Sequence, residues 1–201
     1  MAHWLTDNTI GWSPLVAADQ VFLHAAPTGG LVLDENGVSG GAVYTLTQNG
    51  VIAGDIAAKF PHLAGIPAWE LDAADATNAP ELLKGQIAVS AFAGGDLVDA
   101  TGLQIPGVLD DLYAYVAYGE QLGPVWIGGT PALKLWSPTA KSVTLHIFDD
   151  ANPATTSITQ TMVLNPDSGI WSLVGPPNWK NKYYLYEVEV YVHSTGEVEH
   201  N

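Results

Sequence analysis

Apolar and polar residues alternate with a period of two in several parts of the chain, which is the pattern of half-buried β-strands. The clearest stretch is Ala132–Asp150, which alternates up to Trp136 and again over Val143–Phe148. Pro138 ends the first run, because proline cannot donate a hydrogen bond to a strand ladder. The stretch therefore predicts two strands joined by a turn.

The same signal predicts strands elsewhere, and the longest is Lys182–Val192. Its even-numbered residues from Tyr184 to Val192 form one apolar face, whereas Glu187 and Glu189 lie on the other. We therefore expect the even-numbered face to point into a core. Helical signals are limited to a short helix at Asp55–Leu63 and a helical turn at Pro80–Lys84. The other predicted strands are Gln20–His24, Val43–Thr47, Gly85–Phe92, Gln160–Leu164 and Ile170–Val174.

Many short strands with turn signals between them predict an all-β fold. We expect two immunoglobulin-like β-sandwich domains in tandem, with one or two short helices in the first. The spacer Ala117–Pro131 holds four glycines and two prolines, which is typical of a linker. The net charge is −11 over residues 1–118 and −4 over residues 119–201. The boundary is therefore expected near Gly119, giving domains 1–118 and 119–201.

The composition narrows the classes of partner. The chain has 201 residues and a net charge of −15, so it repels phosphate backbones and anionic lipids. We therefore expect neither nucleic acid nor a membrane as a partner, and a neutral sugar suits the chain better. No apolar run approaches the ~20 residues of a membrane span. The absence of arginine, with many glycines and alanines, indicates a cold-adapted or salt-tolerant source.

The first residues, MAHWLTDNTIGW, lack the basic and apolar regions of a signal peptide. The sequence leaves the compartment open between two alternatives. The protein is cytoplasmic, or it is a secreted or cell-surface bacterial protein whose signal peptide was removed, and the second alternative is favoured.

The chain shows no convincing catalytic or metal-binding motif. A retaining glycosidase needs two carboxylates about 5–5.5 Å apart in a sugar-lined cleft. Asp110-Asp111 and Asp149-Asp150 are adjacent pairs without clustered aromatics, so we interpret both as solvated loops. The six histidines never fall in zinc-site spacing, and the chain has no cysteine. The Asp34–Gly37 loop lacks a regular calcium-ligand ladder. We expect no catalytic residue, metal or cofactor.

Tryptophan and lysine suggest a sugar-binding loop instead. A pyranose ring stacks on an indole, and lysine or asparagine donates hydrogen bonds to its hydroxyls. The loop residues Trp179, Lys180, Asn181 and Lys182 offer all of these groups together. Trp171 lies within a predicted strand and shares a face with Leu173, so we interpret it as packing, with a second stacking platform as the alternative. For Trp179 the alternatives are packing in a core or interface and a displayed sugar platform. Trp136 is interpreted as structural, and docking on another domain is the plainest explanation for Trp4, Trp12, Trp69 and Trp126.

Longer motifs carry a family resemblance over nearly the whole chain. The first half resembles the N-terminal β-domain of bacterial type I pullulanases and plant limit dextrinases through AHWLTDNTIGW, AAKFPHLAGIPAW and ATGLQIPGVLDDLYAY. The second half resembles a family 48 carbohydrate-binding module, the isoamylase N-terminal-type domain, through GGTPALKLWSPTAKSV and WKNKYYLYEVEVYVHSTGEVE. LWSPTA alone is weakly specific, whereas the order of all these motifs is specific.

The resemblance implies a non-catalytic part of an α-1,6-glucan debranching enzyme. The family's proteins continue into a catalytic barrel with an aspartate nucleophile and a glutamate acid, which are absent from these residues. The implied partners are α-glucans (pullulan, amylopectin or limit dextrin) and that barrel. A purely structural module that docks on the barrel without binding sugar is the alternative, and an unrelated adhesion sandwich fits the composition but not the motif order.

Overall fold

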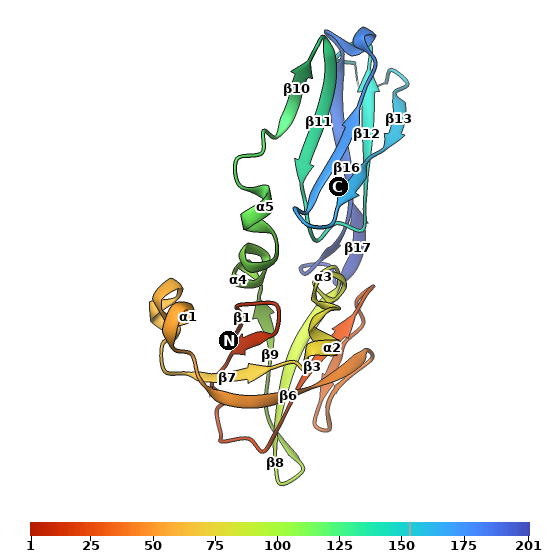
Figure 1. Cartoon of the computed structure of the whole chain (residues 1–201). Coiled ribbons are helices and arrows are strands. Elements are labelled where there is room, and N and C mark those ends of the chain that lie inside the picture. Colours follow the sequence, from red (N-terminus) through yellow and green to blue (C-terminus); the bar gives the residue numbers. More distant parts are fainter. Residues whose placement is uncertain (153) are drawn as a thin grey trace.

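The computed structural model describes residues 1–152 and 154–201, which form a barrel and a sandwich connected by a short helical segment (Figure 1). The strands of the barrel region are β1 Ala2–Trp4, β2 Thr9–Gly11, β3 Gln20–Ala26, β4 Val32–Asp34, β5 Gly37–Ser39, β6 Ala42–Val51, β7 Pro67–Glu70, β8 Gln86–Ala93 and β9 Asp96–Gln104. Its short helices are α1 Gly54–Lys59, η1 Pro61–Leu63, α2 Ala73–Ala76 and α3 Ala79–Leu82.

The remaining elements follow in chain order. The connecting segment consists of α4 Pro106–Leu109, the π-helical η2 Asp110–Ala114 and α5 Tyr115–Ala117. The sandwich consists of β10 Gly123–Ile127, β11 Thr130–Trp136, β12 Ser142–Phe148, β13 Ile158–Thr161, β14 Val163–Asn165, β15 Ile170–Val174, the 3₁₀ helix η3 Pro177–Trp179, β16 Tyr183–Val192 and β17 Glu197–His200. The mostly-strand structure confirms the all-β class.

The first sheet closes on itself, in the order β1-β2-β7-β6-β3-β8-β9. The two ends of this order meet through parallel pairing of β1 with β9, in which Ala2 is opposite Leu103. The prediction of a β-sandwich for residues 1–118 was therefore wrong. Parallel pairing between strands so far apart leaves no local periodicity, so the sequence pattern could not distinguish a barrel from a sandwich.

Large aromatic rings fill the barrel. Trp4, Trp12 and Trp69 are 0%, 1% and 5% exposed and lie in its core, and the Trp69 indole donates a hydrogen bond to the Trp12 carbonyl over 2.9 Å. The interpretation of these three rings as a docking surface was therefore wrong. Each lies in or beside a very short strand, where burial comes from several neighbouring strands and not from a recognisable local period.

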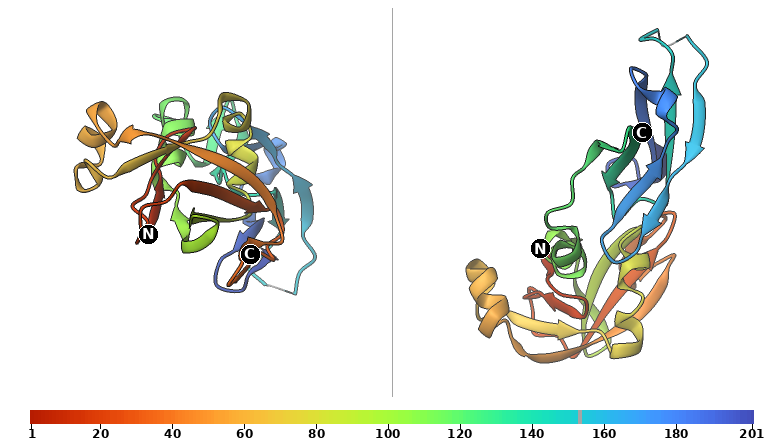
Figure 2. Two further views of the ribbon diagram at one scale, coloured as in Figure 1. Left: turned by 90° about the horizontal axis from the view of Figure 1, so that it is seen from below. Right: turned by 45° about the horizontal axis from the view of Figure 1, so that its top comes forward.

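Two four-stranded sheets form the sandwich, in the orders β10-β11-β15-β14 and β13-β12-β16-β17. Their shared core includes Leu133 and Trp171 from the first sheet and Val143 and Leu145 from the second. Tyr186 and Val188 pack against this core, which confirms the predicted inner face of β16 over that part of the strand. Figure 2 shows both units from two further sides, with α1 projecting from the barrel.

The connecting helical segment was not predicted, because Thr101–Tyr115 shows no clear period. Pro106 stands at the start of α4, where its missing N–H costs nothing. Val108 and Tyr113 are buried, whereas Tyr115 is 95% exposed. The π-helical turn η2, which contains Tyr113, shifts the phase of the helix and obscures the usual repeat. Among the described residues, no helix is both long and apolar enough to cross a membrane.

A buried histidine makes the barrel sensitive to acid. His24 is 4% exposed, and its Nε2 lies 2.7 Å from Ser90 Oγ, while Nδ1 has no partner among the described residues. Burial lowers the pKa of His24 below its usual 6.5. The unfolded chain binds this proton more readily than the folded chain does. The contribution of His24 to the free energy of unfolding is therefore fully present above pH 6.5, and it is lost as the pH falls from there through the lowered pKa of the folded state.

We expect acid to destabilise the chain and His24→Gln to remove part of that effect. One such histidine accounts for at most about 1.4 kcal/mol of lost unfolding free energy between about pH 7.5 and about pH 5.5. Urea unfolding at both pH values measures the loss. His3→Gln is the matched variant. Burial and neighbouring His62 also lower the pKa of His3, so this substitution should remove another part of the same acid sensitivity. An unchanged pH dependence in His24→Gln would contradict the assignment.

Candidate functional site

The sandwich carries a groove of about 760 Å³ at the end that lies away from the barrel. β10, β11, β12, η3 and β16 all contribute to its walls, so it draws on both sheets. This size falls in the usual range for small-molecule sites. The lining residues are Pro124, Trp126, Gly129, Pro131, Leu133, Ile147, Pro177, Trp179, Lys180, Asn181, Lys182 and Tyr184.

Trp179 is held in the groove by the backbone around it. It ends η3, packs partly against the sandwich core and lies directly against Gly175, where a Cβ would overlap the indole. The Trp179 carbonyl accepts a hydrogen bond from the Lys182 amide over 3.1 Å. Asn181 has a φ of 66°, so the loop turns sharply there. The ring is thus fixed on one side and faces the groove with the rest of its surface.

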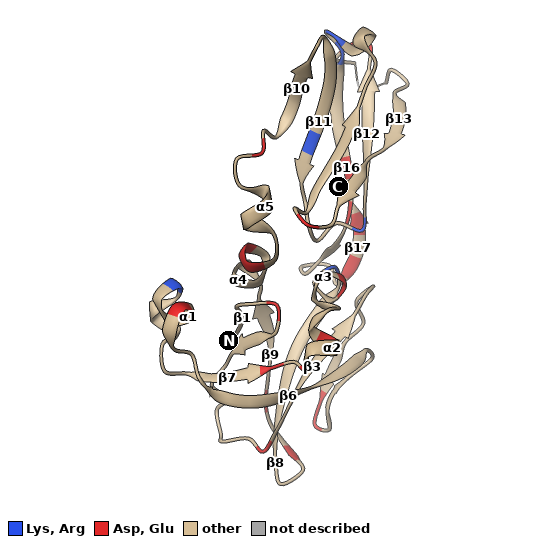
Figure 3. Ribbon diagram, viewed as in Figure 1, with Lys and Arg blue, Asp and Glu red and all other residues tan. Residues whose placement is uncertain are grey.

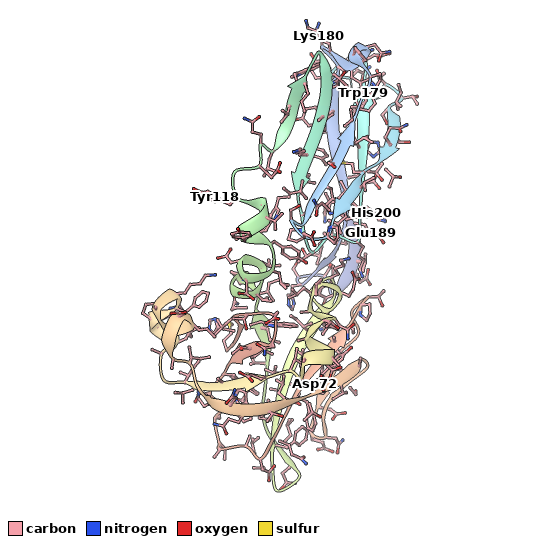
Figure 4. The ribbon with its side chains drawn as sticks, viewed as in Figure 1. Asp72, Tyr118, Trp179, Lys180, Glu189 and His200 are labelled. Atoms are coloured by element: carbon pink, nitrogen blue, oxygen red, sulfur yellow. The ribbon has the colours of Figure 1, made fainter. Side chains whose placement is uncertain are left out.

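The two lysines of the loop differ in their environment. Lys182 donates to Asp149 Oδ1, which neutralises part of its charge. Lys180 is exposed, and no salt bridge to it occurs among the described residues (Figure 4). Figure 3 shows this end of the sandwich as a basic spot in a mostly acidic chain. Lys180 is therefore free to donate hydrogen bonds to a ligand in the groove.

Trp171 does not belong to this groove. It is 7% exposed in the sandwich core, and its indole N–H donates to the Ser137 carbonyl over 2.9 Å. The structure therefore contradicts its use as a second stacking platform. Its side chain points inward because Trp171 lies opposite Leu135 and Leu164 within the sheet.

Two aromatic residues that were not predicted as site residues line the groove. Trp126 is 46% exposed on the edge strand β10, and Tyr184 is 37% exposed near the start of β16. Tyr184 was expected in the core, but it lies near the start of β16 at the end of the sandwich, where its side chain is only partly covered. The pKa of neighbouring Tyr186 is raised to about 12, by burial and by Tyr184.

The adjacent aspartates make structural contacts. Asp110 pairs with Lys59 at 3.7 Å, and Asp111 accepts the backbone N–H of Asp7 over 2.9 Å. Asp150 accepts hydrogen bonds from Asn152 and Thr155, which hold its pKa below the usual value. These hydrogen bonds and the ion pair give the aspartates a structural role, and none of them requires a catalytic role.

Histidines that are far apart in the chain meet on the outer face of the second sheet. Glu187 accepts hydrogen bonds from His146 over 2.7 Å and from His200 over 3.0 Å, and these bonds hold the pKa of Glu187 below its usual value. Within the described ranges no group of three or more histidine, aspartate or glutamate side chains is arranged to hold a metal ion. The cluster connects β12, β16 and β17.

Comparisons with known proteins agree on one family. The pullulanase N2 domain family matches residues 1–111, and carbohydrate-binding module 48 (isoamylase N-terminal domain) matches residues 121–200. Pullulanase 1 of Arabidopsis thaliana chloroplasts is 35% identical over 98% of this chain, and a Klebsiella pneumoniae pullulanase is 30% identical over 98%. The matches cover 20% and 18% of those proteins, so the chain spans about a fifth of their length.

Solved structures give the same result. The crystal structure of Klebsiella pneumoniae pullulanase complexed with maltotriose superposes with a TM-score of 0.88 at 31% identity, covering 100% of this chain and 19% of that one. The pullulanase structure from Klebsiella oxytoca gives a TM-score of 0.88 at 30% identity, covering 100% and 19%. The chain therefore belongs to the pullulanase N2 domain family and continues into a carbohydrate-binding module 48.

Proposed function

We propose that this chain is the non-catalytic, α-glucan-binding and scaffolding N-terminal part of a pullulanase-type glycoside hydrolase that debranches α-1,6-linked glucans. The observation that carries the proposal is the groove in which Trp126, Trp179 and Tyr184 stand beside Lys180. Indole and phenol rings can stack on the apolar face of a pyranose, and the lysine can donate to its hydroxyls. The maltotriose complex of a relative supports an α-glucan as the ligand.

The proposal assigns hydrolysis to residues outside this chain. The domain boundary is proposed between residues 118 and 119, after α5 and before β10, with the sugar site wholly in the second domain. Pullulan, amylopectin and limit dextrins are the proposed substrates of the complete enzyme. They are neutral polymers, which suits a chain with a net charge of −15.

A second candidate function is docking on the catalytic domain of such an enzyme. It is favoured by a run of exposed apolar residues between the barrel and the groove: Tyr115, Tyr118, Leu122 and Ile127 are 95%, 92%, 52% and 67% exposed. The Tyr118 side chain points away from both units in Figure 4. Adjacent exposed apolar side chains are typical of a surface that another domain covers. Binding sugar and docking on the catalytic domain are compatible.

We expect weak sugar binding that depends on the groove. One or two stacked rings and a few hydrogen bonds should give a Kd on the order of 0.1–1 mM for maltoheptaose or β-cyclodextrin. Trp179→Ala should weaken binding at least about tenfold, the size of one lost stacking contact. Lys180→Met should weaken it less, because the alkyl stem remains. Calorimetric titration of the isolated chain measures these affinities, and the value should vary little with salt.

Two matched variants sharpen this test. Gly175→Ala keeps all groove side chains but drives a Cβ into the Trp179 ring, so it should weaken binding as Trp179→Ala does. Tyr118→Ala lies outside the groove and should bind like the parent chain. Full affinity in Trp179→Ala would place the site elsewhere. An absence of heat up to about 10 mM ligand, which is about tenfold above the weakest expected Kd, would leave docking as the function.

The isolated chain should not hydrolyse pullulan. Its paired aspartates hold Lys59, Lys182 and backbone N–H groups, and they do not flank a sugar cleft as hydrolysis requires. A reducing-end assay with the purified chain should give the buffer rate. Activity that persists after repurification would contradict the non-catalytic assignment, and Asp110→Asn and Asp149→Asn would test whether these carboxylates carry it.

The docking function predicts self-association of the isolated chain. Replacing exposed tyrosines with serine removes apolar area from the surface that the catalytic domain would cover. Analytical ultracentrifugation should therefore show weaker association for Tyr115→Ser/Tyr118→Ser than for the parent chain. A parent chain that stays monomeric at all concentrations would argue against an exposed docking surface.

A further inference from the structure

Few interactions join the barrel to the sandwich apart from the connecting segment. No backbone hydrogen bond, sheet pairing or salt bridge links residues 1–104 to residues 121–152 or 154–201. Within these ranges, elements pack extensively only against elements of their own unit. Cavities of about 250 Å³ and about 480 Å³ lie between the two units. Units that are joined so weakly are expected to move relative to one another.

The helical part of the connecting segment is fixed to the barrel. Val108 belongs to the barrel core, and Leu112 packs against that core. Asp111 accepts the backbone N–H of Asp7 over 2.9 Å. α4 and η2 therefore move with the barrel, and a rotation between the units must take place after them.

The five residues 119–123, which lead from α5 into β10, have the properties of a hinge. Gly119 and Gly123 have φ of 87° and 76°, and a Cβ built on either of them meets nothing within 4 Å. Glycine changes its backbone conformation at low cost, and no packing restrains these two. The salt bridge of Glu120 with Lys134, at 2.6 Å, spans Gly123. Gly119 is therefore the freer of the two joints.

The Tyr191 hydroxyl gives a reason for the two units to separate. It is shielded from solvent and has no hydrogen-bond partner among the described residues, and burial raises the pKa of Tyr191. The barrel covers one edge of this ring, because a Cβ built on Gly29 would lie 2.9 Å from Tyr191 Cε2, next to the carbon that carries the hydroxyl. A buried hydroxyl without a partner is unfavourable. Moving the Gly29 turn away from the ring would return the hydroxyl to water and remove this cost.

We propose that residues 119–123 form a hinge on which the sandwich swings as a rigid body. It swings between the closed position described here and an open position in which water reaches the Tyr191 hydroxyl. The groove lies at the end of the sandwich away from the barrel, so a small rotation at the hinge moves the groove over a long arc (Figure 1). The use of this motion to present an α-glucan rests on the proposed function, whereas the hinge itself does not.

Residual dipolar couplings of the parent chain test the hinge directly. These couplings, measured by NMR in a weakly aligning medium, give one alignment tensor for each rigid body. Two units that are locked together share a single tensor, whereas hinge motion on the microsecond to millisecond scale gives them tensors of different magnitude. We expect the tensors fitted separately to the barrel and to the sandwich to differ.

Tyr191→Phe tests the role of the hydroxyl. The substitution removes the unpaired group without changing the shape of the ring, so the ratio of closed to open chains should rise about fivefold or more. The two tensors should then become more alike. Tyr183→Phe is the matched control, because Tyr183 lies on the same strand and is 54% exposed. It should give the tensors of the parent chain.

An insertion tests the position of the hinge. Two glycines inserted after Gln121 lengthen the joint and should increase the difference between the tensors. The same insertion after Gly94, in the turn between β8 and β9, is the control and should leave the difference unchanged.

A single tensor shared by both units of the parent chain would overturn the hinge. Different tensors that respond equally to Tyr191→Phe and Tyr183→Phe would overturn the closed and open positions proposed here. An insertion after Gln121 that has no more effect than the one after Gly94 would overturn residues 119–123 as the joint. All three measurements are made without sugar. A failed hinge therefore leaves the calorimetric test of the groove, and with it the proposed function, unaffected.

Discussion

Buried tryptophan rings stabilise the hydrophobic core of each of the two units. Trp4, Trp12 and Trp69 fill the barrel, and Trp171 fills the sandwich. The chain has no cysteine, so no disulfide shares this task. Each buried ring removes about 150–250 Å² of surface from water, and the indole N–H groups of Trp69 and Trp171 pair with backbone carbonyls. Closure of the barrel through β1 and β9 makes the first of these cores possible.

The groove uses aromatic side chains that the cores do not. Trp126 and Trp179 are large apolar rings left partly open at the end of the sandwich, and Gly175 provides the space in which Trp179 lies. The charged residues are also distributed unevenly between the groove and the rest of the chain. Most acids lie on the barrel and the outer strand faces, whereas Lys180 and Lys182 lie at the groove (Figure 3). A neutral, ring-shaped ligand is not repelled by the net negative charge, and the open aromatic rings and the lysine donors lie together at this end of the sandwich. This joins the fold to the proposed function.

Strand positions, the core face of β16 around Tyr186 and Val188, and the loop that carries Trp179 could be predicted because each depends on neighbours in the chain. Long motifs such as ATGLQIPGVLDDLYAY, and the order in which the motifs follow one another, also predicted the family, which the comparisons confirmed. Alternation also predicted that Trp171 packs within its strand. The same reasoning misplaced Tyr184 in the core, because alternation shows that a side chain has a face without showing how far along the strand that face is covered. The cold-adapted or salt-tolerant source stays a prediction from composition alone.

The sequence by itself determined the all-β class and the family, since these depend on local period and on motifs within single stretches of the chain. The sugar partner and the sugar-binding role of the Trp179 loop stay predictions. Only the tertiary structure decided that the first sheet closes into a barrel and that Trp126 joins Trp179 in one groove. These features depend on contacts between distant segments. Such contacts are set by the total packing of many side chains, which no single stretch of sequence encodes.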